Sequence, residues 1–278
     1  MAGTQKTSQF TAATVANPTD EVPLLQGGVL KRVQVKTLVG NPDVGWLATG
    51  ESWTYSSWDA TRRIGVVNVP SDATTKYTAG NRVRISQTTG GTKYAIITYV
   101  TSTTLTLHFQ SGITLNNEAI STPFYSPLDS PLGFNKDRSL WQIEVTQTTQ
   151  QSQASPGSGT WYNTGSNSIS LGAGIWDTYY EVLVETNRAS GPAIDVLTTL
   201  STSNSSESDK GFTAWSFLNG GAVTSWNTVH THTRRKQIAL TSNSQYYLNI
   251  SCINGGMTSL DVRGNNGTTR INAISAYL

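Results

Sequence analysis

Apolar and polar residues alternate along most of this chain, in short runs separated by turn residues. Residues 82–86 and 104–109 each place an apolar side chain at every second position. A period of two is typical of a strand with one buried face. Turn residues recur about every eight to twelve positions, as in sandwiches and small barrels. The pattern predicts an all-β protein.

Changes in this pattern divide the chain into three predicted regions. Residues 1–40 form an N-terminal arm, residues 41–135 a small β-barrel module, and residues 136–278 a C-terminal jelly-roll-like β-sandwich. Residues 146–159 are rich in Gln, Ser and Thr and are expected to be a loop or an exposed β-edge. The strands expected in the last region are 140–145, 161–162, 169–171, 179–185, 194–197, 212–215, 228–232, 237–240, 246–252 and 270–274.

The arm contains a predicted hairpin. Residues 22–25 and 29–35 are its strands, and Gln26-Gly27-Gly28 is its turn, because glycine tolerates positive φ. Two strands alone are barely stable in water. We therefore expect the arm to pack on a neighbouring chain or a larger assembly.

Composition limits the function classes. Hydrophobic residues make up 36% of the chain and charged residues only 13%, so Ser, Thr, Asn and Gln carry the polarity. A net charge of +2 provides no field for nucleic acid. No apolar run approaches the ~20 residues of a membrane span. The lone Cys252 excludes an internal disulfide and is expected in the core. The first ten residues lack a signal-peptide pattern, so we expect synthesis in a host cytoplasm.

The arm also carries a resemblance. Residues 8–13, SQFTAA, and 20–31, DEVPLLQGGVLK, resemble an N-terminal motif of tailed-bacteriophage tail and fibre proteins, where this segment attaches the protein to the particle. The resemblance implies that this chain is located in a virion. The arm residues that would make the attachment are Phe10, Val22, Leu24, Leu25 and Val29.

Two further segments resemble phage proteins. Residues 45–135 are similar to a small β-barrel module of tail and fibre proteins, which a Pro-x-Gly-Phe segment closes, here residues 131–134. Asn135 departs from that family, which often has a second proline there. Residues 171–274 resemble the trimeric jelly-roll tips of phage fibres, which are loosely like the C1q and TNF heads. These resemblances imply a homotrimer.

Tryptophans in the C-terminal region are the candidate ligand-binding residues. Aromatic rings beside amide and hydroxyl groups suit sugars, which stack on rings and hydrogen-bond through hydroxyls. The same residues could instead fill the core or the trimer contacts. Trp176 and Trp226 lie in Gly-, Ser- and Asn-rich stretches and are expected to be exposed. The full candidate set is Trp161, Trp176, Trp215 and Trp226.

His230-Thr231-His232 is the candidate metal site. Alternation along a strand places His230 and His232 on one face. Three copies around an axis would supply six imidazoles, an octahedral set for a structural transition metal. The alternative is two surface histidines on a polar strand and no metal. No other cofactor is expected.

The expected function is binding rather than catalysis. No nucleophile elbow or phosphate-binding loop occurs in the chain. We expect a trimeric fibre or spike component whose partners are its own copies, other tail or capsid proteins, and a host surface polysaccharide or receptor. Nucleic acid and membrane insertion are not expected. One alternative is a capsid or tail decoration or adaptor protein. Another is a glycan hydrolase or esterase; hydrolysis would require two facing carboxylates.

Overall fold

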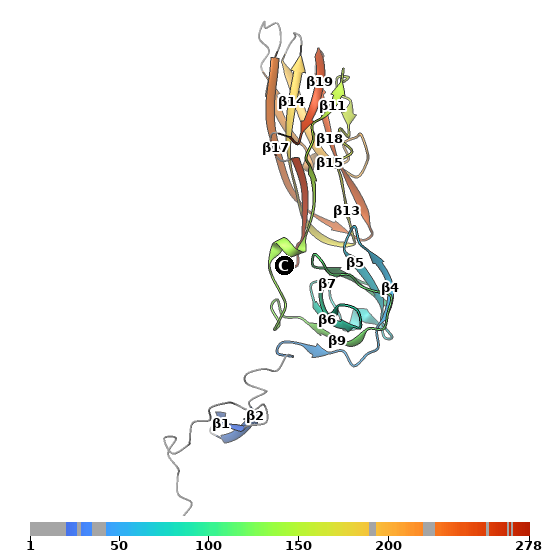
Figure 1. Ribbon diagram of the computed structural model, residues 1–278, viewed down its shortest axis with the longest axis vertical. Coiled ribbons are helices and arrows are strands. Elements are labelled where there is room, and N and C mark those ends of the chain that lie inside the picture. The colour runs from blue at the N-terminus through green and yellow to red at the C-terminus, as the bar shows by residue number, and fades with distance from the viewer. Residues whose placement is uncertain are drawn as a thin grey trace, which may run out of the picture.

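The computed structural model describes most of the chain. It covers the backbone of residues 21–26, 29–34, 43–188, 193–218, 226–253, 256–265, 267 and 269–278, and the side chains of the same residues except 21–34, 218, 226 and 227. The described elements are strands and three short 3-10 helices (Figure 1). The predicted all-β class is confirmed.

The arm contains the predicted hairpin. Strands β1 (Glu21–Gln26) and β2 (Val29–Gln34) pair antiparallel in a two-stranded sheet. The register runs from Glu21 opposite Gln34 to Gln26 opposite Val29. Phe10 and the two turn glycines lie outside the described residues.

The central module is one seven-stranded antiparallel sheet in the order β3-β9-β6-β7-β8-β5-β4. Its strands are β3 (Leu47–Ala48), β4 (Thr54–Asp59), β5 (Ile64–Asn68), β6 (Arg82–Gln87), β7 (Gly91–Val100), β8 (Thr104–Phe109) and β9 (Ser121–Ser126). The alternation predicted β5 to β8, whereas β3, β4 and β9 were not expected, because their sequences alternate weakly.

This sheet curls around its own core. Trp58 of β4 packs on Phe109 of β8 at 5.7 Å between ring centroids, and Tyr125 of β9 packs on Tyr77 at 5.1 Å. Strands from both halves of the sheet therefore share one apolar cluster. In the described part of the chain no ladder joins β3 to β4, so the module is a curled sheet and not a barrel closed by hydrogen bonds.

The C-terminal region is a two-sheet sandwich. One sheet contains β10 (Gln142–Gln147), β11 (Gln151–Ala154), β14 (Gly174–Arg188), β17 (Trp226–Leu240), β19 (Met257–Arg263) and β20 (Thr269–Ser275). The other contains β12 (Trp161–Tyr162), β13 (Ser168–Leu171), β15 (Ile194–Ser201), β16 (Ala214–Leu218) and β18 (Ser244–Ile253).

Three strand pairs lie end to end and occupy one position each. Strand β10 pairs with β20, and β11 pairs with β19. Strands β20 and β19 in turn pair with successive halves of β14. Likewise β12 and β13 pair with successive parts of β18. Each sheet is therefore four strand positions wide. In chain order, β10 and β11 share position 1, β12 and β13 share position 2, β14 to β18 take positions 3 to 7, and β19 and β20 share position 8. The first sheet then runs 1-8-3-6 and the second runs 2-7-4-5. This is jelly-roll connectivity, as the sequence predicted.

Several strand boundaries differ from the prediction. The expected strands 228–232 and 237–240 form the single strand β17, which pairs with β14 along its whole length. Residues 210–212 form the helix η4 (Lys210–Phe212), because Asp209 caps it through the Gly211 amide. Strand β19 was missed, while β11 is an edge strand, as expected for residues 146–159.

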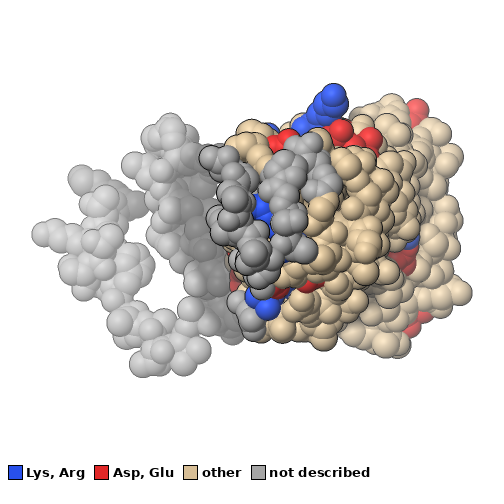
Figure 2. Space-filling model, turned by 90° about the horizontal axis from the view of Figure 1, so that it is seen from above, with Lys and Arg blue, Asp and Glu red and all other residues tan. Residues whose placement is uncertain are grey.

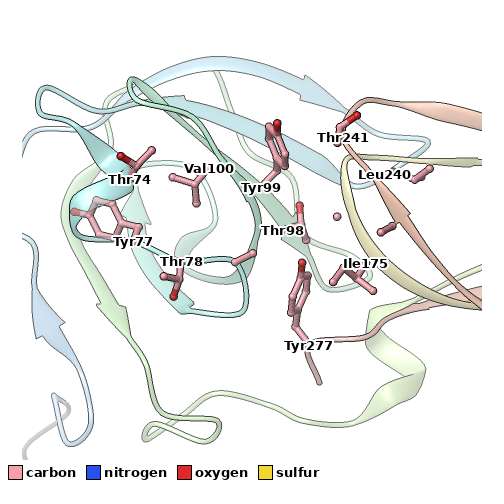
Figure 3. A pocket seen from close by; sticks show the side chains of 13 residues that line it. Thr74, Tyr77, Thr78, Thr98, Tyr99, Val100, Ile175, Leu240, Thr241 and Tyr277 are labelled. Carbon is pink, nitrogen blue, oxygen red and sulfur yellow. The ribbon is translucent and has the colours of Figure 1, made fainter.

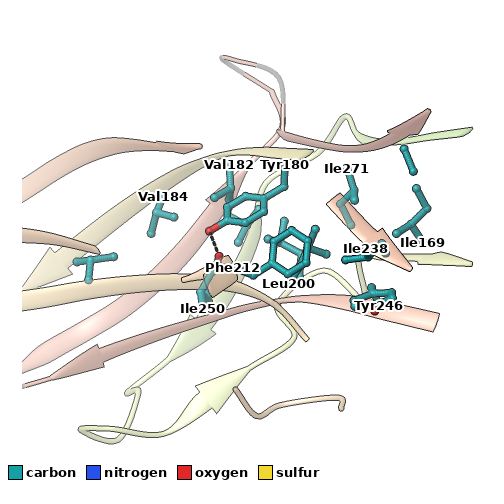
Figure 4. Close-up of a cluster of buried hydrophobic side chains, with 14 of the residues drawn as sticks. Ile169, Tyr180, Val182, Val184, Leu200, Phe212, Ile238, Tyr246, Ile250 and Ile271 are labelled. Carbon is teal, nitrogen blue, oxygen red and sulfur yellow. Dashed lines mark hydrogen bonds between the residues drawn. The ribbon is translucent and has the colours of Figure 1, made fainter. Parts of the chain in front are cut away.

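Alternating side chains of both sheets fill the sandwich core (Figure 4). On β14, Tyr180, Val182 and Val184 point inward and are fully buried. The Tyr180 hydroxyl donates a hydrogen bond to the Phe212 carbonyl at 2.9 Å, which satisfies the one polar atom of that ring. Cys252 is buried in the same core, as predicted.

Module and sandwich meet in a packed seam. Register places Ile64, His108, Ile96 and Arg82 in one row across β5, β8, β7 and β6. This row lies on the face opposite the module core, and the sandwich covers it, so its side chains are at most 4% exposed. The chain ends at this junction (Figure 1).

The segment that closes the module belongs to this seam. The Phe134 amide donates to the Pro131 carbonyl at 3.1 Å, and Gly133 has φ of +84°, as the third position of a type II turn requires. The turn places the Phe134 ring on Trp141 at 5.1 Å, in a stacked geometry. The helix η3 (Arg138–Trp141) follows this turn and leads directly into β10 of the sandwich, whereas the helix η2 (Ala73–Thr75) lies within the module, between β5 and β6.

Arg82 fastens the chain end to the module. Its side chain is 1% exposed and donates to the carbonyls of Gly80 at 2.6 Å, Asp129 at 3.2 Å and Tyr277 at 2.8 Å. A polar residue in an alternating strand ordinarily faces solvent. Arg82 does not, because the sandwich covers the face of β6 on which it lies.

Candidate binding face of the sandwich

An exposed aromatic surface covers part of the five-stranded sheet. Opposed residues of antiparallel strands share a face, and the register aligns one row across β12, β18, β15 and β16. That row is Trp161, Ser251, Leu197 and Trp215. The neighbouring positions Val196 and Cys252 point into the core, so the row lies on the outer face.

A second row adds Phe217, Asp195 and Ile253 on the same face. Trp215 is 62% exposed and Phe217 is 53% exposed, with 6.4 Å between their ring centroids. We call Trp161, Leu197, Trp215, Phe217 and Ile253 the aromatic face. Large apolar side chains exposed side by side mark interaction sites in soluble proteins.

A carboxylate orients the most exposed ring. The Trp215 indole N–H donates a hydrogen bond to Asp195 Oδ1 at 2.9 Å. The edge of the indole is therefore satisfied within the protein, and its position is fixed before any ligand arrives. Such a ring can stack on the C–H face of a sugar or on a partner side chain.

A pinned loop borders this surface on the side of the module. Asn249 is fully buried on the same outer face, and its amide donates to the carbonyls of Ser203 at 2.9 Å and Ser206 at 2.7 Å. The loop therefore covers this part of the sheet. The sequence signal that could have predicted this contact is an asparagine within the apolar run 246–252.

The outer face of the six-stranded sheet has the opposite chemistry. Register places Glu144, Asn272, Tyr179 and Arg235 in one row across it. Ion pairs link its strands: Arg270 to Glu181 at 3.1 Å, and Arg235 to Asp177 at 3.1 Å. This polar face has its hydrogen-bonding groups largely satisfied by one another.

Trp176 is a correction to the sequence analysis. It was expected to be exposed but is fully buried, with its indole N–H donating to the Gly172 carbonyl at 2.9 Å. Its ring lies 4.9 Å from the His108 ring of the module. The surrounding glycines reflect the close approach of two bodies, not a surface loop.

The other candidates are placed differently. Trp161 is half-buried at one end of the row, on β12, and Trp215 is exposed at the other end, on β16. The side chain of Trp226 is outside the described residues, although its backbone starts β17. The attachment residues Val22, Leu24, Leu25 and Val29 are described only as backbone of the hairpin.

The two candidate metal ligands lie on one face, as predicted, but inside the sandwich edge. Ser216 Oγ lies 3.2 Å from His230 Nδ1 and 2.8 Å from His232 Nε2, and His232 Nδ1 lies 3.0 Å from Thr198 Oγ1. Both ring nitrogens of His232 are therefore engaged in hydrogen bonds. Among the described residues no group of three His, Cys, Asp or Glu side chains could hold a metal ion.

Burial keeps these imidazoles neutral. It lowers the pKa of His230, and burial followed by the neighbouring His230 lowers the pKa of His232 to about 4. Ser216 beside His232 has the spacing of a nucleophile and its base. In the described part of the chain no carboxylate hydrogen-bonds to either histidine, and Thr198 takes the orienting position instead, so the cluster resembles a structural hydrogen-bond chain.

Charged side chains are sparse on the end of the sandwich. Figure 2 looks onto the end drawn at the top of Figure 1 and shows Lys, Arg, Asp and Glu as scattered groups on a mostly uncharged surface. No helix in the described ranges is both long and apolar enough to cross a bilayer.

Comparisons with known proteins identify only weak structural similarities. No family model and no curated protein matches the chain. Among solved structures, a T13 viral particle of infectious bursal disease virus is similar at 12% identity and a TM-score of 0.28, over 92% of this chain and 62% of that one.

Two further structures are similar at the same level. Dimeric latent PorU from Porphyromonas gingivalis has 9% identity and a TM-score of 0.25, over 84% of this chain and 24% of that one. The Gt strain of infectious bursal disease virus has 16% identity and a TM-score of 0.26, over 91% and 64%. The chain thus spans less than two thirds of each of these proteins. Likenesses of this size carry no argument about function.

Proposed function

We propose that the chain is a structural protein of a tailed-bacteriophage virion, a homotrimeric fibre or spike component. The N-terminal arm attaches it to other tail or capsid proteins, and the C-terminal sandwich binds a host surface glycan or receptor. It acts by binding, and repetition of a weak site three times raises the avidity.

The aromatic face is the observation that carries this proposal. Trp215 and Phe217 expose their rings on a flat sheet surface, and Asp195 holds the indole in place. Sugars bring apolar C–H faces and hydroxyl groups together, so they match a ring set beside a carboxylate. Among the described side chains, the polar face offers no comparable exposed ring.

The arm supports the attachment role. Strands β1 and β2 form a sheet of their own, and two strands with no further layer are marginal in water. A partner surface on the particle would supply the missing layer. We expect deletion of residues 1–40 to abolish incorporation into particles while the remaining chain still binds host cells.

Host-cell adsorption of the full-length protein tests the proposed binding face. We expect the double variant Trp215→Ala, Phe217→Ala to lose adsorption by roughly a hundredfold, since each exposed ring contact contributes up to about tenfold. Tyr247→Ala is the matched control, because Tyr247 lies on the same sheet but beyond the pinned loop. Unchanged adsorption of the double variant would remove the aromatic face from the mechanism.

Light scattering tests the assembly. We expect a mass of three times 29.9 kDa for the full chain. A monomer that becomes ordered only on the particle would favour the alternative of a decoration or adaptor protein. That alternative also draws on the aromatic face, since another virion protein could cover it; protection of Trp215 in intact particles would then be the expected result.

A further inference from the structure

A pocket of 390 Å³ opens beside the seam, between the module and the sandwich. The module contributes Tyr77, Tyr99 and the end of β7, and the sandwich contributes Ile175, Leu240 and Tyr277. Figure 3 shows the Tyr99 and Tyr277 rings, one from each body, on either side of Thr98. The pocket exists only because the two bodies are packed together.

Backbone geometry keeps the two bodies close at this place. Gly174 begins β14 with φ of +140°, and a Cβ there would come within 2.8 Å of the Thr98 side chain. Glycine therefore allows β14 to pass directly over β7. A larger residue would separate the two bodies and open the pocket to solvent.

The lining combines aromatic rings with hydroxyl groups and contains no charged side chain. Thr78 and Thr241 contribute hydroxyls to the lining, whereas the hydroxyls of Thr74 and Thr98 donate to Asp72 Oδ1 at 2.7 Å and to the Thr106 carbonyl at 3.4 Å. The Tyr77 hydroxyl donates to Glu51 at 2.8 Å, outside the lining, so Tyr77 is anchored by a group that does not belong to the pocket. Burial raises the pKa of the Tyr277 hydroxyl, against the effect of a hydrogen bond with the Ile175 backbone.

We infer that this pocket binds one neutral sugar unit. A pyranose has an apolar face for a tyrosine ring and hydroxyls that both donate and accept, which threonine and tyrosine hydroxyls can match. An acidic sugar would enter a site without a cation to receive it, and desolvation of its carboxylate would oppose binding. The volume lies within the range of small-ligand sites.

The inference extends the proposed function, because a host polysaccharide would then have a second contact at the seam, away from the aromatic face. The probes are methyl α-glucopyranoside, methyl α-galactopyranoside and methyl α-mannopyranoside, with sodium glucuronate as the charged control. Saturation-transfer NMR on the full-length protein measures their binding.

Two variants alter the pocket in different ways. Ala239→Trp places a bulky ring on an exposed position at its edge, and Tyr99→Ala removes one half-buried wall. We expect each to lower affinity by roughly tenfold or more, the change that corresponds to one lost ring contact. Thr233→Trp, another exposed position on β17, is the matched control and should leave binding unchanged.

The outcomes separate the two sites. Binding of at least one neutral glycoside that Ala239→Trp or Tyr99→Ala removes, and that Trp215→Ala retains, supports the inference. No binding of any neutral glycoside, or binding of glucuronate alone, overturns it. Binding that both pocket variants retain but Trp215→Ala removes also overturns it, while leaving the proposed function intact. Unchanged host-cell adsorption of the Trp215 and Phe217 variant would instead count against the proposed function.

Discussion

Trp176 in the seam and Trp215 on the aromatic face both lie in strands of the sandwich but have opposite environments. Trp176 is fully buried against the module, and Trp215 is 62% exposed at the opposite outer surface. In both places a ring N–H finds an acceptor within the protein, Gly172 in the first and Asp195 in the second. The difference is whether a second body covers the ring. The seam therefore stabilises the fold, and the aromatic face remains available for a partner.

The largest effect should follow from Trp176→Ala. Removing a fully buried indole leaves a cavity between sandwich and module and should cost about 3–5 kcal/mol of unfolding free energy. Urea unfolding followed by far-UV circular dichroism measures the change. A loss under 1 kcal/mol would mean that the two bodies are not packed as described.

Arg82→Met should cost about 3 kcal/mol, because three partly buried carbonyl groups lose their donor while the apolar stem is kept. Arg235→Met is the control, since Arg235 is 69% exposed and its ion pair should contribute less than about 1 kcal/mol. Equal effects of the two substitutions would show that Arg82 does not connect the chain end to the module.

Acidification should weaken the protein through its buried histidines. Burial, and then the Arg63 guanidinium, lowers the pKa of His108 to about 3 from 6.5, and His232 is lowered to about 4. The unfolded chain takes up a proton as pH falls through 6.5 and the folded protein does not. The contribution is thus complete above this pH and decreases below it.

We expect a loss of roughly 1.4 kcal/mol per pH unit for each histidine once pH is well below 6.5, measured by urea unfolding down to pH 5, above the range where carboxylates titrate. His108→Phe keeps the packing between Trp141 and Trp176 and should remove the contribution of one histidine from the slope. A flat profile in this window would show that these imidazoles are solvated.

Trp215→Ala should have the smallest effect on stability, within about 0.5 kcal/mol, as expected for an exposed position without a buried network. The same urea experiment tests it. A loss comparable to that of Trp176→Ala would place Trp215 in a core or a subunit contact, and the aromatic face would no longer be a free binding surface.

Local pattern predicted most strands of both β regions, because alternation records which face of a sheet is buried. It did not predict that Arg82 and His108 are buried. The sandwich, which lies more than thirty residues away in sequence, covers the face of the module on which they lie. For the same reason it misjudged Trp176. Glycine-rich surroundings indicate either a solvent-exposed loop or a close approach of backbones, and only the packing distinguishes the two.

The candidate site shows the same limit. Trp161 and Trp215 were named from residue type, but Leu197, Ile253 and the orienting Asp195 were not. These residues become neighbours through the pairing of β12, β18, β15 and β16, a register that depends on loops and on long-range partners.

Hydroxyl-radical footprinting of the full-length protein, with and without host surface polysaccharide, tests the contrast between the two tryptophans most directly. Mass spectrometry would report oxidation at each residue. We predict that Trp215 is oxidised in the free protein and protected by the polysaccharide, while Trp176 is unreactive in both samples. An unreactive Trp215 in the free protein, or the same oxidation of Trp215 with and without polysaccharide, would contradict the assignment of the aromatic face as the binding surface.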